Sequence, residues 1–159
     1  MNDYMIVNSS VANIYKSYTF TSELVNQALI WEKLIILDKK NNWYKIKQKD
    51  GYVGWIHEFY IIDSDVYDSD ISLQNKKNWY LIKDRLAKVK LTDSSELLIS
   101  FGASLPCFQD KDNFFTILPS GEKGSIAKNS ILKYNSNHTL ENILNYSMKL
   151  IGCPYLWGG

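Results

Sequence analysis

"NWYKIKQKDGYVGWI" (residues 42–56) carries two short runs of aromatic and β-branched residues on either side of a polar segment. Asp50-Gly51 within that segment is a strong signal for a tight turn between antiparallel strands. Gly54 follows inside the second run, where a glycine indicates a bulge or a close approach of neighbouring backbone. The stretch therefore predicts a β-hairpin.

The hairpin pattern recurs later in the chain. "NFFTILPSGEKGSI" (113–126) aligns with it when one residue is deleted, and the segments just upstream also correspond. The aligned pairs are Trp43 with Phe114, Tyr44 with Phe115, Ile46 with Ile117, Gly51 with Gly121, Gly54 with Gly124, and segment 33–41 with segment 104–112. Because an offset of about 70 residues is the length of one small barrel, the sequence predicts two compact β-barrels.

The remaining segments predict a linker and one helix. Thr139 is a suitable helix cap, Glu141 suits the first turn, and Gly152 with Pro154 ends the helix. Apolar side chains recur at helical spacing, at Leu140, Ile143, Leu144, Met148 and Ile151. We therefore divide the chain into a first barrel (1–64), a linker (65–78), a second barrel (79–134) and a C-terminal segment (135–159).

Composition limits the class of protein. The 159 residues are 45% hydrophobic and 22% charged, with a formal net charge of +1, which argues against nucleic-acid binding. No run approaches the roughly 20 apolar residues of a membrane span, and the N-terminus has no signal-peptide pattern, so we expect a cytoplasmic protein without a membrane partner. No metal-ligand spacing or phosphate-binding glycine loop occurs, so no metal and no cofactor is expected.

Three motifs resemble one family. "TSELVNQALIWEKLIILDKKNNWYKIKQKDGYVGWI" (21–56) resembles the first bacterial SH3 domain of NlpC/P60 cysteine peptidases of the dipeptidyl-peptidase VI type. "ISFGASLPCF" (99–108) with "LPSGEKGSI" (118–126) resembles their second SH3 domain, and "LIGCPYLWGG" (150–159) resembles the opening of their catalytic domain. One departure is Trp31, where the family often has Gly.

The resemblance implies a mainly β fold, with two small SH3-like β-barrels followed by one α-helix that opens an α+β papain-like domain. In the family, a D-C-S-G segment with the nucleophile follows P-Y-x-W-G-G, so we expect that the chain as given lacks the catalytic Cys and is inactive. Cys153 lies at a helix end, where the dipole does not favour a thiolate, and Cys107 is expected to be a small buried hydrophobe. His57 and His138 are expected at or near the surface.

The resemblance also implies a substrate and its contacts. The family cleaves murein peptides with a free N-terminal L-Ala-γ-D-Glu, at the bond between γ-D-Glu and an L-diamino acid. Glu23 and Tyr52 match the positions that hold the peptide's amine, and Tyr155 matches the tyrosine that contacts the D-Glu carboxylate. From the residues alone, a solvated turn carboxylate is the favoured interpretation of Glu23, whereas Tyr52 and Tyr155 are equally compatible with aromatic packing.

Two functional interpretations follow. The first is the substrate-gating portion of a γ-D-glutamyl-L-diamino acid peptidase used in cell-wall peptide recycling. The alternative is a non-catalytic tandem SH3 module that binds cell-wall peptide or a protein partner. The second copy has Ser94 and Glu122 where the first has Glu23 and Tyr52, which favours a specialised role for the first copy.

Overall fold

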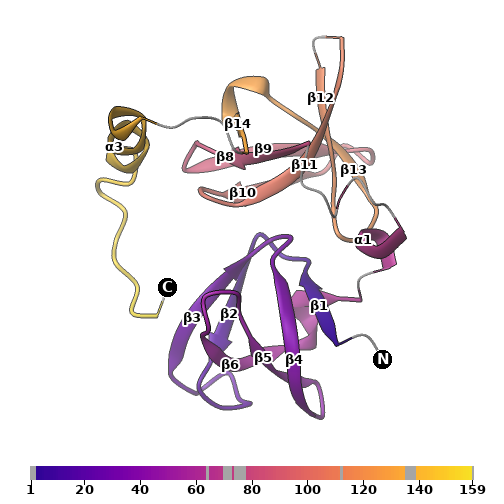
Figure 1. The fold of residues 1–159 in the computed structure, drawn as a ribbon, viewed down its shortest axis with the longest axis vertical. Helices are drawn as coiled ribbons and strands as arrows, with labels where there is room; N and C mark the ends of the chain where they lie inside the picture. Colours follow the sequence, from indigo (N-terminus) through magenta and orange to yellow (C-terminus); the bar gives the residue numbers. More distant parts are fainter. Residues whose placement is uncertain are drawn as a thin grey trace.

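The computed structural model describes residues 3–63, 65–69, 73, 78–111, 113–134 and 139–158. It contains two seven-stranded antiparallel sheets, followed by one short C-terminal helix. Each sheet curls into a small barrel, and the two barrels lie one above the other with the helix to one side (Figure 1). The predicted fold class, mainly β with two SH3-like barrels and a helix, is confirmed.

The first barrel has the strand order β3-β2-β6-β5-β4-β1-β7. Its strands bury some of their side chains in the interior and leave others at the surface, as a half-buried sheet requires. The elements are β1 (Tyr4–Val7), β2 (Val11–Tyr15), β3 (Leu24–Leu29), β4 (Lys33–Lys40), β5 (Trp43–Lys47), β6 (Val53–His57), a 3-10 turn (Glu58–Tyr60) and β7 (Ile61–Ile62).

The second barrel repeats this topology, in the order β10-β9-β13-β12-β11-β8-β14. Each strand has a counterpart in the first barrel, so the predicted duplication is confirmed. The elements are β8 (Trp79–Ile82), β9 (Leu86–Leu91), β10 (Glu96–Ser100), β11 (Ser104–Asp110), β12 (Asn113–Ile117), β13 (Lys123–Ile126), a 3-10 turn (Lys128–Ser130) and β14 (Ile131–Lys133).

The strand register corrects the alignment of the two hairpins. Ile46 pairs with Gly54 in the first barrel, and Thr116 pairs with Gly124 in the second. The offset is therefore 70 throughout the hairpin, and no residue is deleted in its turn. The counterpart of Phe114 is Tyr44, not Trp43, and both side chains are buried in their barrel cores.

The one-residue difference between the copies lies upstream, in β4. The register of β4 against β5 shifts between Ile36 and Asp38, which marks a β-bulge at Leu37. The pairing of β11 with β12 runs without a shift from Cys107 to Asp110. A sequence comparison could not place the extra residue, because Leu34, Ile35, Ile36 and Leu37 are all apolar and show no alternation in which a shift of one residue would appear.

Gly54 and Gly124 sit where the backbones of two strands come close together. A Cβ atom on Gly54 would lie 2.9 Å from the carbonyl oxygen of Tyr15, and one on Gly124 would lie 2.9 Å from that of Lys90. The close backbone approach predicted for Gly54 is confirmed, and the same constraint acts at the same place in both barrels.

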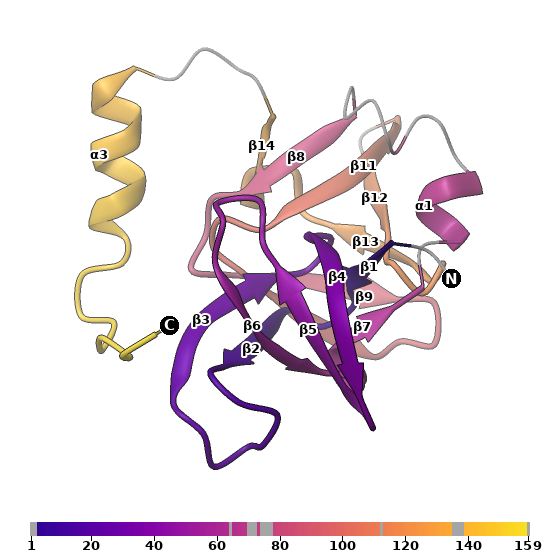
Figure 2. The same ribbon diagram turned by 60° about the horizontal axis from the view of Figure 1, so that its bottom comes forward.

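A hydrophobic cluster spans both barrels and joins them. Ile6, Ile30 and Trp31 of the first barrel pack with the core of the second, and Leu73 from the intervening segment packs with them. Trp79 of this cluster donates its indole N–H to the carbonyl of Leu73 at 2.9 Å. The described part of that segment also contains helix α1 (Asp65–Ser69), which lies on the opposite side of the molecule from the C-terminal helix (Figures 1 and 2).

Trp31 is the centre of this junction. Its indole N–H donates to the carbonyl of Ile117 at 3.1 Å, and its ring packs edge-on against Trp79 at 5.6 Å between centroids. Its backbone is left-handed, with φ of 69°. The counterpart in the second barrel is Gly102, with φ of 80°. The two positions are equivalent because the Trp31 N–H donates to the Val7 carbonyl and the Gly102 N–H donates to the Ile82 carbonyl. Trp31 therefore retains a conformation that favours glycine.

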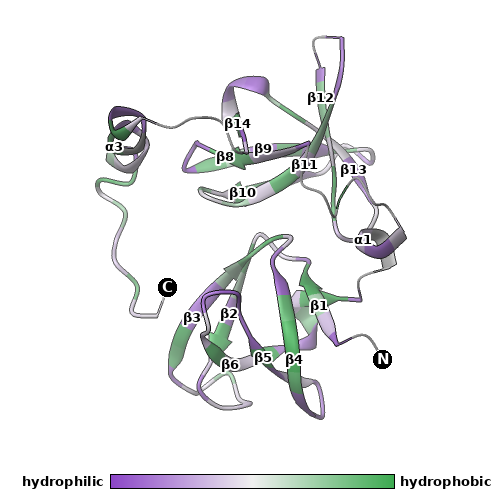
Figure 3. Ribbon diagram, in the orientation of Figure 1, coloured by the Kyte–Doolittle hydropathy of each residue, from purple (hydrophilic) through white to green (hydrophobic). Residues whose placement is uncertain are grey.

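The C-terminal helix α3 (Leu140–Met148) begins as predicted. Thr139 caps it, with its Oγ1 accepting from the N–H of Asn142 at 3.2 Å, and Gly152 with φ of 86° follows its end. It carries both hydrophobic and hydrophilic residues (Figure 3), and Leu140, Leu144 and Met148 are exposed. In the described part of the chain, no helix has the length and apolar character needed to cross a membrane.

Polar contacts attach the end of α3 to the second barrel. The guanidinium of Arg85 donates to the carbonyls of Lys149 and Ile151. In return, the Lys149 ammonium donates to the Lys83 carbonyl and to Asp84, each at 3.1 Å. The β8–β9 turn thus holds the end of the helix, while Leu140, Leu144 and Met148 stay exposed.

We predict that replacing Trp31 destabilises the junction, and that Gly is tolerated better than Ala. Trp31→Ala removes a buried indole, which typically costs about 3–5 kcal/mol, and leaves a Cβ in a left-handed conformation. Trp31→Gly loses the same contacts but relieves the backbone, so it should be more stable than Trp31→Ala by about 1 kcal/mol. Urea unfolding of both variants measures the difference, and an equal or lower stability of the Gly variant would contradict the assignment.

We also predict that the two cysteines differ in reactivity. Both are free; Cys107 is buried and Cys153 is exposed. Burial raises the pKa of Cys107 to about 12, against which a hydrogen bond with Thr116 acts only weakly. At pH 8 iodoacetamide should therefore modify only Cys153 in the folded protein, and both cysteines in urea, because only the thiolate reacts. Rapid modification of Cys107 in the native protein, detected by mass spectrometry, would contradict this.

Candidate functional site

Glu23 lies at the neck of the loop between β2 and β3. The Lys16 N–H donates to the Glu23 carbonyl at 2.9 Å, which closes the loop, and the Lys16 ammonium pairs with the Glu23 carboxylate, also at 2.9 Å. The hydrogen bond and the positive charge of Lys16 lower the pKa of Glu23, and a hydrogen bond with Trp157 acts in the same direction. Glu23 therefore presents an ionised carboxylate at the surface of the first barrel.

Tyr52 lies at the end of the β5–β6 turn. Its backbone is held on both sides, since its carbonyl accepts from the Gln48 N–H at 2.9 Å and its N–H donates to the Asp50 carboxylate at 3.1 Å. Its side chain is 55% exposed, so it does not pack into the barrel on Trp55. The phenol is therefore available to a ligand.

The C-terminal segment returns to the first barrel beside Glu23. Gly158 adopts φ of 76°, and a Cβ atom on it would lie 2.3 Å from the carbonyl oxygen of Leu24 and 3.1 Å from the N of Val25. Only glycine fits that approach. The segment therefore lies against the start of β3, and Figures 1 and 2 show the same placement from two sides.

Tyr155 lies in this segment and is 81% exposed, so the core packing considered for it does not occur. The structure thus places Glu23, Tyr52 and Tyr155 at the surface, the first two on adjoining parts of one barrel and the third on the segment that contacts it. The segment approaches the barrel through Gly158 rather than through Tyr155. The binding roles of the three residues remain predictions.

The second barrel provides an internal comparison. At the first loop, the Leu91 N–H donates to the Ser95 carbonyl at 2.9 Å, as the Lys16 N–H does to the Glu23 carbonyl. At the second turn, the Leu118 N–H donates to the Glu122 carbonyl at 2.8 Å, as the Gln48 N–H does to the Tyr52 carbonyl. The counterpart of Glu23 is therefore Ser95, one residue beyond the predicted Ser94, because the register of β2 against β3 shifts between Ile14 and Tyr15, where β3 has one residue that β10 lacks. Glu122 is the counterpart of Tyr52, as predicted.

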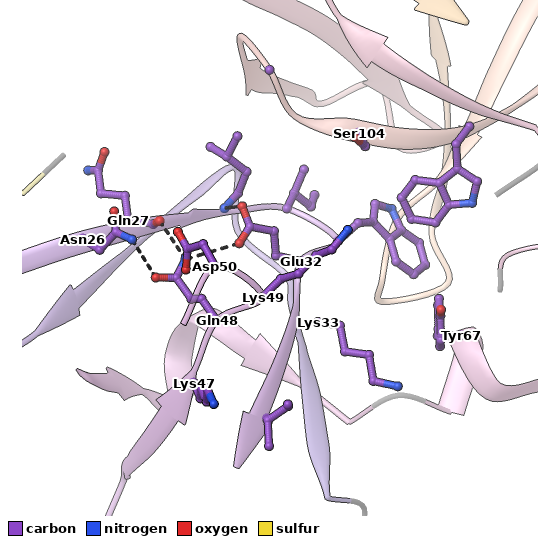
Figure 4. Close-up of a pocket in the computed structure, with 16 residues that line it drawn as sticks. Asn26, Gln27, Glu32, Lys33, Lys47, Gln48, Lys49, Asp50, Tyr67 and Ser104 are labelled. Atoms are coloured by element: carbon purple, nitrogen blue, oxygen red, sulfur yellow. Dashed lines mark hydrogen bonds between the residues drawn. The ribbon is translucent and has the colours of Figure 1, made fainter. Parts of the chain in front are cut away.

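A groove of about 740 Å³ lies between the two barrels (Figure 4). Its walls come from β3, the β3–β4 turn and the β5–β6 turn of the first barrel, and from Gly102 and Ser104 of the second. Asp50, which holds the backbone of Tyr52, is part of the lining. The groove therefore runs alongside the turn that carries Tyr52.

An amide network forms the floor of this groove. Gln48 is buried and accepts from the Asn26 amide at 2.8 Å. Its own amide donates to the Gln27 carbonyl at 3.1 Å and to the Glu32 carboxylate at 3.3 Å, while Glu32 also accepts from the Leu29 N–H at 3.0 Å. These groups satisfy one another, so the network holds the turn rather than offering free donors.

The described residues give no arrangement for metal binding. Within them, no group of three or more His, Cys, Asp and Glu side chains is placed to hold an ion. His57 packs between Phe20 and Trp43, and its Nδ1 accepts from the Phe59 N–H at 3.2 Å, which is a structural role. His138 lies outside the described residues.

Sequence reasoning missed two residues of the site, Lys16 and Trp157. Lys16 has no motif, and its relation to Glu23 depends on how the loop between them closes. The effect of Trp157 on the pKa of Glu23 depends on how the end of the chain folds back onto the first barrel, which no local pattern reveals.

Comparisons with known proteins agree with this architecture. Residues 14–58 match the family described as the bacterial dipeptidyl-peptidase SH3 domain. The chain is 24% identical over 158 residues to the gamma-D-glutamyl-L-lysine dipeptidyl-peptidase of Bacillus cereus, and the match covers 89% of this chain and 46% of that protein. The chain thus spans less than half of this curated relative.

Two solved structures share the fold. An NlpC/P60 family protein from Bacillus cereus superposes with a TM-score of 0.85 at 18% identity, over 98% of this chain and 66% of the other. An NlpC/P60 endopeptidase from Photobacterium damselae subsp. piscicida superposes with a TM-score of 0.70 at 16% identity, over 99% and 39%. Within the first barrel, residues 14–58 thus match the bacterial dipeptidyl-peptidase SH3 domain, and the chain is similar to part of the Bacillus cereus dipeptidyl-peptidase and to the fold of two NlpC/P60 proteins.

Proposed function

We propose that this chain is the substrate-gating SH3 region of a murein-peptide cysteine peptidase, and that its first barrel binds the free amino end of peptides that begin L-Ala-γ-D-Glu. The observation that carries the proposal is the exposed, ionised Glu23 at a closed loop neck. The second barrel has the same backbone closure but places Ser95 there. The carboxylate is therefore not needed to build the barrel, which supports a role in binding.

The chemistry of the groups suits an α-ammonium ion. An ammonium offers three donors, and a carboxylate is an acceptor without protons to compete. The Tyr52 hydroxyl supplies a second acceptor from the neighbouring turn. In this proposal Tyr155 donates to the α-carboxylate of D-Glu, on the side of the site formed by the C-terminal segment.

The reaction proposed for the whole protein follows from the family. A Cys thiolate attacks the γ-carbonyl of D-Glu and releases the peptide that begins with the diamino acid, and water then hydrolyses the acyl-enzyme to free the L-Ala-γ-D-Glu dipeptide. The name of the Bacillus cereus relative supports this specificity. We place this activity in cytoplasmic recycling of cell-wall peptides. The SH3 region would restrict it to peptides that have a free amino end.

We predict that Glu23→Gln weakens binding of the L-Ala-γ-D-Glu dipeptide by about tenfold or more, because the charge-assisted hydrogen bond is lost. Isothermal titration calorimetry at pH 7 measures this, and the N-acetylated dipeptide should bind the wild type equally poorly. Glu96→Gln is the matched control, because Glu96 is also exposed and pairs with Lys88 at 2.9 Å in the second barrel. Its affinity should equal that of the wild type.

Other outcomes would point elsewhere. Equal affinity of the wild type and Glu23→Gln for the free dipeptide would contradict the amine site. Binding that ignores N-acetylation would favour the alternative of a tandem SH3 module that takes cell-wall peptides without reading their amino end.

We predict a separate effect at Tyr155. Tyr155→Phe should weaken binding of the dipeptide by about tenfold, because a hydrogen bond to a charged group is lost. It should leave unchanged the weaker binding of the analogue in which the D-Glu α-carboxylate is an amide. A similar loss with both ligands would mean that Tyr155 acts through the aromatic ring or the position of the segment, and the assigned contact would be wrong.

A further inference from the structure

Lys16 already supplies Glu23 with an ammonium group. Its Nζ lies 2.9 Å from Oε2 of Glu23, the distance at which a ligand's amine would bind. The two side chains are 68% and 49% exposed, so Lys16 can move into solvent without disturbing packed neighbours. The group that pairs with Glu23 is therefore replaceable.

The loop between them keeps this pair together. Besides the backbone bond between Lys16 and Glu23, the Ser17 N–H donates to the Ser22 hydroxyl at 3.0 Å. At the tip of the loop, Phe20 packs on Trp43 with 4.8 Å between ring centroids. Because the loop is held at its neck and its tip, the ion pair forms without ordering further residues.

The second barrel has neither this ion pair nor the aromatic support of its loop. The counterparts of Lys16 and Glu23 are Leu91 and Ser95, and the backbone bond between them is the same. The register also places Asn113 at the position of Trp43, so the aromatic support is absent there. The pair is thus an addition to the first barrel rather than a requirement of the fold.

We propose that Lys16 occupies the position of the ligand's ammonium in the free protein and is displaced when a peptide binds, which makes Lys16 a specificity-determining residue. This inference rests on the proposed amine site. A peptide with a free amino end restores the charge pairing of Glu23 when it displaces Lys16. A peptide with a blocked amino end cannot restore this charge pairing. Lys16 therefore stays paired with Glu23, and the blocked peptide is excluded.

The effect on affinity should be modest, because exposed ion pairs are weak. Lys16→Met should tighten binding of the L-Ala-γ-D-Glu dipeptide by about two- to fivefold, since no competitor must be displaced. Lys88→Met is the matched control, because Lys88 forms an equally exposed pair with Glu96 at the same 2.9 Å distance. It should bind like the wild type. Lys16→Gln provides a second variant if the Met variant unfolds at lower urea concentration.

A spectroscopic measurement distinguishes displacement from other roles. NMR signals of the Lys16 side chain should move to the position of a free lysine as the dipeptide saturates the wild type, and should stay unchanged with the N-acetylated dipeptide. If Lys16 instead orients Glu23 for the ligand, both Lys16 variants will bind more weakly than the wild type. That result, or a Lys16 signal that stays paired in the complex, would overturn the proposal.

The same titrations separate this inference from the amine site itself. If the wild type binds and Glu23→Gln does not, but Lys16→Met binds no tighter than the wild type, the amine site stands and the displacement is wrong. If Glu23→Gln binds as well as the wild type, the amine site is wrong and the role of Lys16 falls with it.

Discussion

The packing of Trp31 between the two barrels determines how the rest of the molecule is arranged. Its indole is bonded to Ile117 of the second barrel and packed on Trp79. To place this side chain in the junction, the backbone of Trp31 adopts a left-handed conformation. In the second barrel the equivalent residue with this conformation is Gly102. The burial of a large aromatic ring outweighs this local strain. The junction makes one body of two small barrels that would each have a limited core.

Duplication explains why the candidate residues Glu23 and Tyr52 lie on one barrel without counterparts of the same chemistry on the other. Both copies keep what the topology requires, including the strand order, the loop closures and the glycine at the close backbone approach. The first copy adds Lys16, Glu23 and an aromatic support on positions that face outward. Because outward positions contribute little to the core, they are free to take on binding chemistry without a loss of stability.

The C-terminal segment links the two barrels from the outside. The β8–β9 turn of the second barrel holds the end of α3 through Arg85, and the start of β3 in the first barrel receives Gly158. Tyr155 and Trp157 lie between these two attachments. The position of the candidate site thus depends on both barrels, although its carboxylate comes from one.

Local sequence patterns determined the two barrels, the Asp50-Gly51 turn, the Thr139 cap and the close approach at Gly54, because alternation, turn propensity and capping act over a few residues. The tertiary structure alone decided the bulge at Leu37, the left-handed Trp31, the pairing of Lys16 with Glu23 and the return of Trp157 to the first barrel. Each of these depends on which distant segments pack together. Their energies come from burial and from contacts between elements, which leave no periodic signal along the chain.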